Sequence, residues 1–386
     1  MAILGMGAMA GMAVGFEADE ELLGAIGVIP QAGFTFIQRL TFGNELAFDG
    51  LALSAIVLGS VGWAVIGALV TKVVSARIGN TEGPALSRLA AFLGAVYSLH
   101  VRDATQHTTA MMYAGAAIGV AFAGDLITLF VFWELLAVTS VFQVWARKTD
   151  QAYGAGFRYL LMHIASGLLL LAGIAIYYHD TGSITFEHME LEQGLGPKLM
   201  LLGVGIKACF PPFHTWLVDT YPNATPTGTV FLSAFTTKSA VYVLARGYAG
   251  TEELIWVGGA MAMFPIFYAV IENDLRRVLG YSMINQIGFM VVGVGIGTDL
   301  AVNGAVAHAF NDVIFKGLLF MSMGAVLMRT GKINGSELGG LYKTMPWTAG
   351  FCMVGAASIS AFPLFSGFIS KSLIMAAAAQ EGYTLI

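Results

Sequence analysis

Long apolar segments recur along this chain and leave little room for a water-soluble core. A helix needs about 20 mainly apolar residues to cross the roughly 30 Å of bilayer hydrocarbon. Only structures that satisfy their own backbone hydrogen bonds span lipid, so the segments predict an all-α integral membrane fold with about 10–12 transmembrane helices. The predicted spans cover residues 51–70, 108–123, 125–145, 157–178, 198–218, 226–244, 254–271, 275–297, 300–328 and 347–380.

The composition supports the bilayer as solvent and excludes several functions. Of 386 residues, 57% are hydrophobic and 11% are charged, whereas soluble domains carry about 25% charged residues. The formal net charge of -5 offers no basic stripe for phosphates, so we expect no nucleic acid partner. Cys209 and Cys352 stand far apart, without a Cys/His cluster. We therefore expect the chain itself to bind no metal and no cofactor.

The charges of the loops predict an orientation. Basic residues gather in loops that the number of crossings places on one side, and acidic residues gather in the opposite loops. The basic set is Arg147, Lys148, Arg158, Arg276, Arg277, Arg329, Lys332 and Lys343. The positive-inside rule predicts that this set faces the cytoplasm or its equivalent.

Four ionisable residues lie deep inside predicted spans. Glu134 and Lys207 fall at the midpoints of their segments, and Lys238 and Lys371 lie well within theirs. A charge at the bilayer centre costs roughly 2.5–3.5 kcal/mol on insertion scales, so such residues usually serve ion or proton pathways. The simpler interpretation is an ion pair that holds helices together.

A second group of ionisable residues follows one helical face. His308, Asp312 and Lys316 are spaced i, i+4 and i+8, which places them in register over roughly 12 Å. In an otherwise apolar helix this pattern is typical of a proton relay. The alternative is local pairing of Asp312 with Lys316.

Prolines predict two broken helices. Pro211 and Pro212 interrupt the segment of Lys207, and Pro363 interrupts the last segment, ahead of Lys371. Irregular backbone survives at membrane depth only inside protein or beside water. Two broken helices, each with a lysine near the break, are typical of inverted-repeat transporters.

Several motifs resemble one family. They are Phe-Trp-Glu-Leu-Leu at 132–136, Phe-Pro-Pro-Phe-His-Thr-Trp-Leu at 210–217, Asp-Thr-Tyr-Pro-Asn-Ala-Thr-Pro at 219–226, Leu-Ser-Ala-Phe-Thr-Thr-Lys at 232–238, Ala-His-Ala-Phe-Asn at 307–311, Phe-Lys-Gly-Leu-Leu-Phe at 315–320 and Gly-Gly-Leu-Tyr at 339–342. Between about residues 95 and 376 the chain is similar to the proton-translocating antiporter-like subunits. These include the D-type subunits of Mrp-type Na+/H+ antiporters and the large membrane subunits of respiratory complex I.

The resemblance implies roles for the buried charges. It makes Glu134 and Lys207 a pair, Lys238 the lysine of a central polar axis, His308 the next step and Lys371 the end of the path. Asp312 stands where the family often has histidine. Residues 1–94 match poorly and form a divergent membrane region ahead of an antiporter-like domain at 95–386. We expect its repeats at about 108–246 and 254–386, the second incomplete, because the family's last helices have no counterpart here.

The resemblance leaves three functions open. The first is a proton- or cation-translocating subunit of a multisubunit Na+/H+ antiporter, with H+ and Na+ as the expected ions. The second is a proton-pumping membrane subunit of a complex I-like redox complex, whose cofactors sit on partner subunits. The third is a non-conducting membrane scaffold. Each implies other membrane subunits as partners in the bilayer of a bacterial or archaeal cell.

Overall fold

The computed structural model describes residues 94–383, and these residues form helices joined by short loops. After the short helix η2 (Ser98–His100) the helices run in chain order. Their bounds are α5 (Ala104–Phe122), α6 (Leu126–Trp145), α7 (Asp150–Thr181), η3 (Leu191–Gln193), α8 (Leu195–Lys207), α9 (Thr215–Asn223), α10 (Pro226–Gly247), α11 (Glu253–Ile271), α12 (Leu275–Ile296), α13 (Asp299–Thr330), η4 (Gly335–Glu337), α14 (Leu341–Thr344), α15 (Pro346–Ile359) and α16 (Ser366–Gln380).

The all-α membrane prediction is confirmed. Six of the described helices (α6, α7, α10, α11, α12 and α13) are long and apolar enough to cross a membrane. The predicted spans from residue 108 onward match helices or broken helix pairs, mostly within a few residues, although α7 begins seven residues before its predicted start and α9 ends five residues beyond its predicted end. The predicted span at 51–70 and the divergent region at 1–94, apart from Gly94, lie outside the described residues.

Three consecutive helices occur twice at a constant offset. α5 and α11 begin at residues 104 and 253, and α7 and α13 begin at residues 150 and 299, so both pairs are 149 positions apart. Thr149 and Thr298 cap α7 and α13 through their side chains, and Gly182 and Gly331 end them, each with a φ of 70°. We call residues 104–247 the first repeat and residues 253–380 the second repeat.

Both predicted breaks are present and have the same backbone form. Cys209 and Ala361 adopt φ values of 65° and 56°, each two residues before the proline of its break. The next amide donates back into the preceding helix: Phe210 N to Gly205 O at 2.9 Å, and Phe362 N to Ala357 O at 3.0 Å. The left-handed residue ends the first half of each span, and the proline prevents its continuation.

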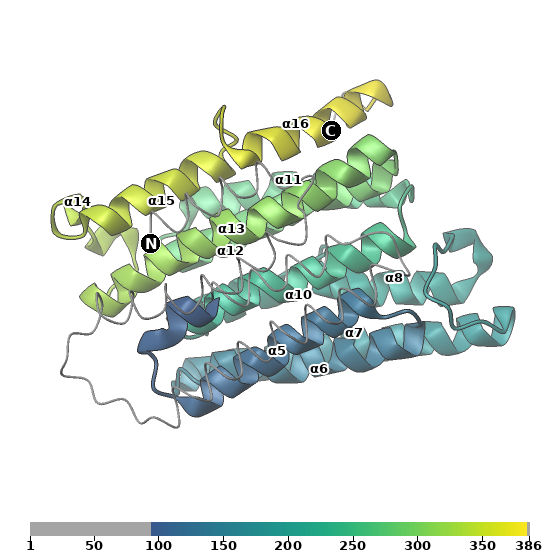
Figure 1. The fold of residues 1–386 in the computed structure, drawn as a ribbon, viewed down its shortest axis with the longest axis horizontal. Coiled ribbons are helices and arrows are strands. Elements are labelled where there is room, and N and C mark those ends of the chain that lie inside the picture. The colour runs from purple at the N-terminus through teal and green to yellow at the C-terminus, as the bar shows by residue number, and fades with distance from the viewer. Residues whose placement is uncertain (1–93, 384–386) are drawn as a thin grey trace, which may run out of the picture. The chain divides into compact units, whose positions relative to one another are not determined.

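The packing brings the two repeats together along α10 and α13. α13 packs against α10, α12, α15 and α16, while α10 also contacts α5, α6 and α8. Figure 1 shows α5, α6 and α7 along one edge of the drawn helices and α15 and α16 along the opposite edge, with α10, α12 and α13 between them. With α8 and α9 counted as one segment, the first repeat contains five successive segments from α5 to α10. An odd number of crossings would start the second repeat on the opposite side, which is the arrangement expected of inverted repeats.

Candidate functional site

Lys207 is placed by the break in the first repeat. It is the last residue of α8, and its side chain is fully buried. Its Nζ donates to the backbone oxygen of Trp133 at 2.6 Å and lies 4.0 Å from the centroid of the Trp133 ring. A carbonyl and an aromatic face both stabilise a cation in a low-dielectric site. The buried ammonium is therefore held by neutral groups of α6.

Glu134, the neighbour of Trp133, does not form an ion pair with Lys207. Within residues 94–383 no carboxylate oxygen lies within 4.0 Å of Lys207 Nζ. The Glu134 carboxylate instead lies against Gly167 of α7, where an added Cβ would overlap Oε1. No described group hydrogen-bonds to this buried oxygen. The pair implied by the family resemblance is separated in this structure, and Glu134 is left able to accept a bond.

Lys238 and Asp312 form the ion pair that the sequence did not predict. Lys238 Nζ on α10 lies 2.5 Å from Asp312 Oδ2 on α13, and their side chains are 5% and 0% exposed. The alternative of local pairing between Asp312 and Lys316 is therefore wrong for this structure. Among the described ion pairs, this one alone joins the first repeat to the second.

His308, Asp312 and Lys316 lie on one face of α13, as their spacing predicts, and all three are buried. Each reaches a different partner. Lys316 Nζ donates to Leu279 O of α12 at 3.2 Å, and Asp312 faces α10. The face is a junction of three neighbouring helices rather than a continuous chain of hydrogen bonds.

His308 is fixed by two side chains that sequence reasoning missed. Its Nε2 donates to Gln286 Oε1 at 3.1 Å, since an amide oxygen only accepts, and its Nδ1 is bonded to Ser370 Oγ at 2.9 Å. Ser370 also accepts from Asn311 Nδ2 at 3.2 Å. Gln286 and Ser370 are polar residues inside apolar helices, which is the signal that could have found them.

Lys371 lies at the second break and is more exposed than the buried lysines Lys207, Lys238 and Lys316. Its Nζ donates to Ile359 O at 2.8 Å and lies 4.9 Å from the centroid of the Phe289 ring. Ile359 is the last residue of α15, so the ammonium caps the carbonyl end of the first half of the broken helix. The structure thus places Lys371 beside α12 and next to the helix that carries His308.

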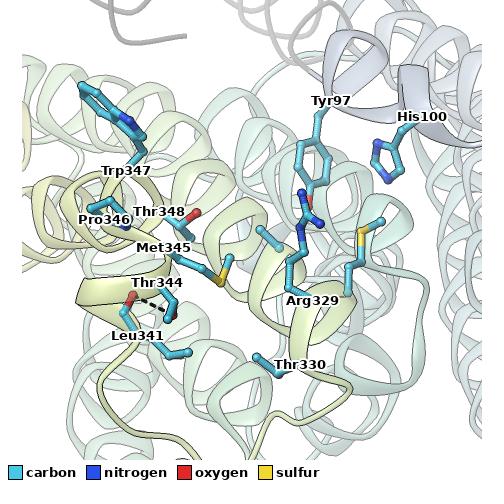
Figure 2. A pocket seen from close by; sticks show the side chains of 12 residues that line it. Tyr97, His100, Arg329, Thr330, Leu341, Thr344, Met345, Pro346, Trp347 and Thr348 are labelled. Atoms are coloured by element: carbon cyan, nitrogen blue, oxygen red, sulfur yellow. Dashed lines mark hydrogen bonds between the residues drawn. The ribbon is translucent and has the colours of Figure 1, made fainter. Parts of the chain in front are cut away.

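Two described cavities lie away from the seven predicted site residues. One of about 700 Å³ is lined by Tyr97, Arg329, Met345 and Trp347 among others, and Figure 2 shows these side chains around it. The other, of about 560 Å³, is polar and lies between the two repeats, beside Arg158 and Asp219. Arg158 binds Asp219 through two nitrogens at 2.7 and 3.0 Å. None of the seven predicted site residues lines either cavity.

Comparison with known proteins identifies the family. The family described as NADH:quinone oxidoreductase/Mrp antiporter, TM, matches residues 123–386. The Na+/H+ antiporter D-type subunit of Alkalihalophilus pseudofirmus is 31% identical over 287 residues, which are 69% of this chain and 58% of that protein. The chain belongs to this family of antiporter-like membrane subunits.

Other relatives extend the likeness to redox complexes. Hydrogenase-4 component B of Escherichia coli is 28% identical over 331 residues, which are 74% of this chain and 49% of that protein. The Mrp complex of Dietzia sp. shares the fold, with a TM-score of 0.74 at 24% identity, covering 79% of this chain and 61% of that one. The archaeal membrane-bound sulfane sulfur reductase gives the same TM-score and identity, covering 86% and 80%.

These relatives place the chain in a membrane. It is an integral membrane protein related to subunits of bacterial and archaeal membrane assemblies, and other membrane subunits are plausible partners. The chain spans less than two thirds of the curated relatives: 58% of the D-type and 37% of the A-type antiporter protein of Alkalihalophilus pseudofirmus.

His163 is the ionisable residue of this antiporter-family chain that sequence reasoning missed altogether. It lies on α7 and is fully buried. A single histidine in an apolar helix usually packs in a core, which is why its spacing gave no signal. The signal lies in the 149-residue offset, because His163 occupies the position in α7 that Asp312 occupies in α13.

No group of three or more His, Cys, Asp or Glu side chains among the described residues converges to hold a metal ion.

Proposed function

We propose that this chain is a proton-translocating subunit of a multisubunit cation/H+ antiporter. The observation that carries the proposal is the buried Lys238–Asp312 ion pair between the first and second repeats. Burying two charges costs several kcal/mol per ion before their attraction offsets it. A chain that only needed to hold two helices together would do so at lower cost with apolar side chains.

The remaining buried charges support a path through this junction. On the first-repeat side, Lys207 is held by neutral groups and Glu134 has a free oxygen. Movement of the Lys207 ammonium toward Glu134 would replace its hydrogen bond to the Trp133 carbonyl with a contact to the Glu134 carboxylate. On the second-repeat side, His308 lies one helical turn from Asp312. Its ring is bonded to Ser370 of α16, the helix that also carries Lys371. Waters would complete the steps, since helices packed about 10 Å apart cannot exchange protons directly.

Each step then changes the partner of one buried charge. A proton that reaches the junction competes with Lys238 for Asp312, because a neutral carboxyl group no longer binds the ammonium strongly. Release of Lys238 frees it to approach the first repeat, and Asp312 passes the proton toward His308. The axis therefore runs Glu134, Lys207, Lys238, Asp312, His308 and Lys371, with Lys316 supporting α13 against α12.

A redox-driven proton pump is the second candidate function. The observation that favours it is the likeness to Hydrogenase-4 component B, which is 28% identical over 331 residues and 74% of this chain. The same buried residues would carry protons, and the driving reaction would take place on partner subunits. The subunits that copurify with the native complex distinguish the two, since an antiporter would lack cofactor-bearing partners.

The test is proton transport by the native complex in proteoliposomes that contain a pH-sensitive dye. Glu134→Gln, Lys207→Ala and Lys238→Ala should each abolish most of the proton flux driven by an imposed cation gradient. Lys332→Ala is the matched control, because Lys332 is an exposed lysine that pairs locally with Glu337. Wild-type flux in all three buried-site variants would refute the proposal and favour a non-conducting scaffold. Exchange of Na+ for K+ in the gradient identifies the cation.

A further inference from the structure

His163 is buried with one ring nitrogen bonded and the other free. Its Nδ1 lies 2.9 Å from Tyr159 O. A carbonyl oxygen only accepts, so Nδ1 carries the hydrogen and Nε2 is the bare acceptor. No described residue hydrogen-bonds to Nε2. A buried acceptor without a donor is a rare arrangement that calls for an explanation such as a bound water or a transient proton.

Aromatic rings hold the imidazole in place. The ring stacks on Tyr159 with centroids 3.9 Å apart and meets the Trp216 ring at 4.6 Å and 83°. Trp216 is itself fixed, because its indole nitrogen donates to Ile206 O at 2.9 Å. Contacts with these two aromatic rings therefore hold the imidazole rigidly in one orientation.

The same face of α7 touches the first-repeat charges. Gly167, one turn or about 6 Å beyond His163, lies against the carboxylate of Glu134. Ser166 accepts from the indole nitrogen of Trp133 at 3.1 Å, and Trp133 provides the carbonyl that holds Lys207. His163 thus lies within one helical turn of the α7 residues that contact Glu134 and Trp133.

Hydroxyl groups lead from the other side of His163 toward the junction. The Tyr159 hydroxyl is bonded to Ser140 Oγ at 2.7 Å and lies 3.3 Å from Thr236 Oγ1. Thr236 is two residues before Lys238 on α10, whose Nζ donates to Thr237 Oγ1 at 3.5 Å. Apart from the Tyr159 phenol, His163 is therefore the one ionisable side chain of α7 that is fully buried.

We propose that His163 is a proton-carrying residue of the first repeat, receiving a proton at Nε2 from the Glu134–Lys207 region through water and returning it toward Lys238. The inference rests on the proposed function. The neutral imidazole gains one proton to become imidazolium and then loses that proton, so no other reactant is needed. Nδ1–H stays bonded to Tyr159 O, and the same nitrogen, Nε2, accepts and releases the proton. His163 is thus a store for one proton, which the surrounding waters fill and empty.

The repeat supports this role independently. At the 149-residue offset, Tyr159 and His163 of α7 occupy the positions of His308 and Asp312 of α13. The two helices have the same length of 32 residues and equivalent caps. Each repeat therefore presents an ionisable group at the same depth of its third helix, and in the first repeat that group is an imidazole.

The test uses the native complex carrying His163→Gln or His163→Ala, reconstituted with a pH-sensitive dye. Glutamine can still donate to Tyr159 O but takes no proton, so flux should fall at least tenfold, in line with the about 10²–10⁴-fold value of acid–base groups. Imidazole added to His163→Ala should restore flux, and pyrrole, a ring of similar size that accepts no proton, should not. His107→Gln is the control, since His107 also bonds a carbonyl, Val101 O at 2.8 Å, at the start of α5.

Three outcomes would assign His163 a packing role and overturn the inference. They are wild-type flux in His163→Gln, equal rescue by imidazole and pyrrole, and failure of both variants to assemble. Loss of flux in Lys207→Ala with normal flux in His163→Gln would refute this inference alone. Normal flux in Lys207→Ala and Glu134→Gln would refute the proposed function itself.

Discussion

Removal of one partner of the Lys238–Asp312 pair tests whether its charges act in transport or only in stability. At 2.5 Å the two groups attract by roughly 7 kcal/mol with an effective dielectric of about 20. Desolvation of two buried ions offsets most of this attraction. Asp312→Leu leaves a buried ammonium without its partner, and Lys238→Met leaves a buried carboxylate. Each single change should cost about 3–5 kcal/mol of unfolding free energy.

The double variant should recover most of that loss. With Lys238→Met and Asp312→Leu together, no charge is left unpaired, and the apolar side chains pack between α10 and α13. We expect a coupling energy of about 3 kcal/mol or more between the two positions. Unfolding in detergent can be followed with a thiol-reactive dye, because the free thiol of Cys209 is buried in the folded chain. Additive single effects would refute the ion pair.

Transport separates the two interpretations of the pair. If the pair only joins the repeats, the stable double variant should move protons at the wild-type rate. If the pair is part of the proton path, the double variant should be stable and inactive, because neither replacement carries a proton. A stable double variant with wild-type flux would refute the axis through this junction.

Three further predictions concern residues that position the site. Arg276 is buried and donates to three carbonyls at the end of α9 at 2.8–3.0 Å, so Arg276→Met should cost roughly 3 kcal/mol or more in the same unfolding assay. Gly167→Ala should displace the Glu134 carboxylate and reduce proton flux without loss of assembly, whereas Gly154→Ala, which meets only the tip of a flexible arginine, should not. The side-chain hydrogen bond from Thr128 lowers the pKa of Asp125, the N-cap of α6. Because the folded-state pKa of Asp125 is lowered, its ionised form stabilises the fold above about pH 4, and this stabilisation is lost as the pH falls through the folded-state pKa. Asp125→Asn should therefore remove this pH dependence from acid unfolding curves.

The spans and breaks could be predicted because their causes are local. Apolar length, helix caps such as Thr149 and Thr298, and prolines after Cys209-Phe210 and Ala361-Phe362 act within one or two turns. These signals fixed most helix bounds within a few residues. They also located the lysines at the two breaks without any knowledge of packing.

The partners of the buried charges could not be predicted in the same way. Spacing offered Lys316 as the partner of Asp312, since residues four apart share a face. The structure joins Asp312 to Lys238, 74 positions away, and directs Lys316 to Leu279 O. Which of two lysines reaches a carboxylate depends on how α10 and α13 are rotated against each other, and that rotation is set by the packing of all the helices around them.

The position of this ion pair determines how proton movement and helix movement can be linked. Among the described residues, Arg158–Asp219 lies within the first repeat, and the other ion pairs apart from Lys238–Asp312 join near neighbours in sequence. Protonation of Asp312 would therefore weaken the one ionic contact between the repeats within residues 94–383, while Arg276 would continue to bind α9 from α12. The repeats would then separate at the junction and stay joined at the end of α9. A cysteine pair across α10 and α13 should consequently cross-link more slowly at a pH that protonates the junction, and a rate independent of pH would separate proton transfer from helix movement.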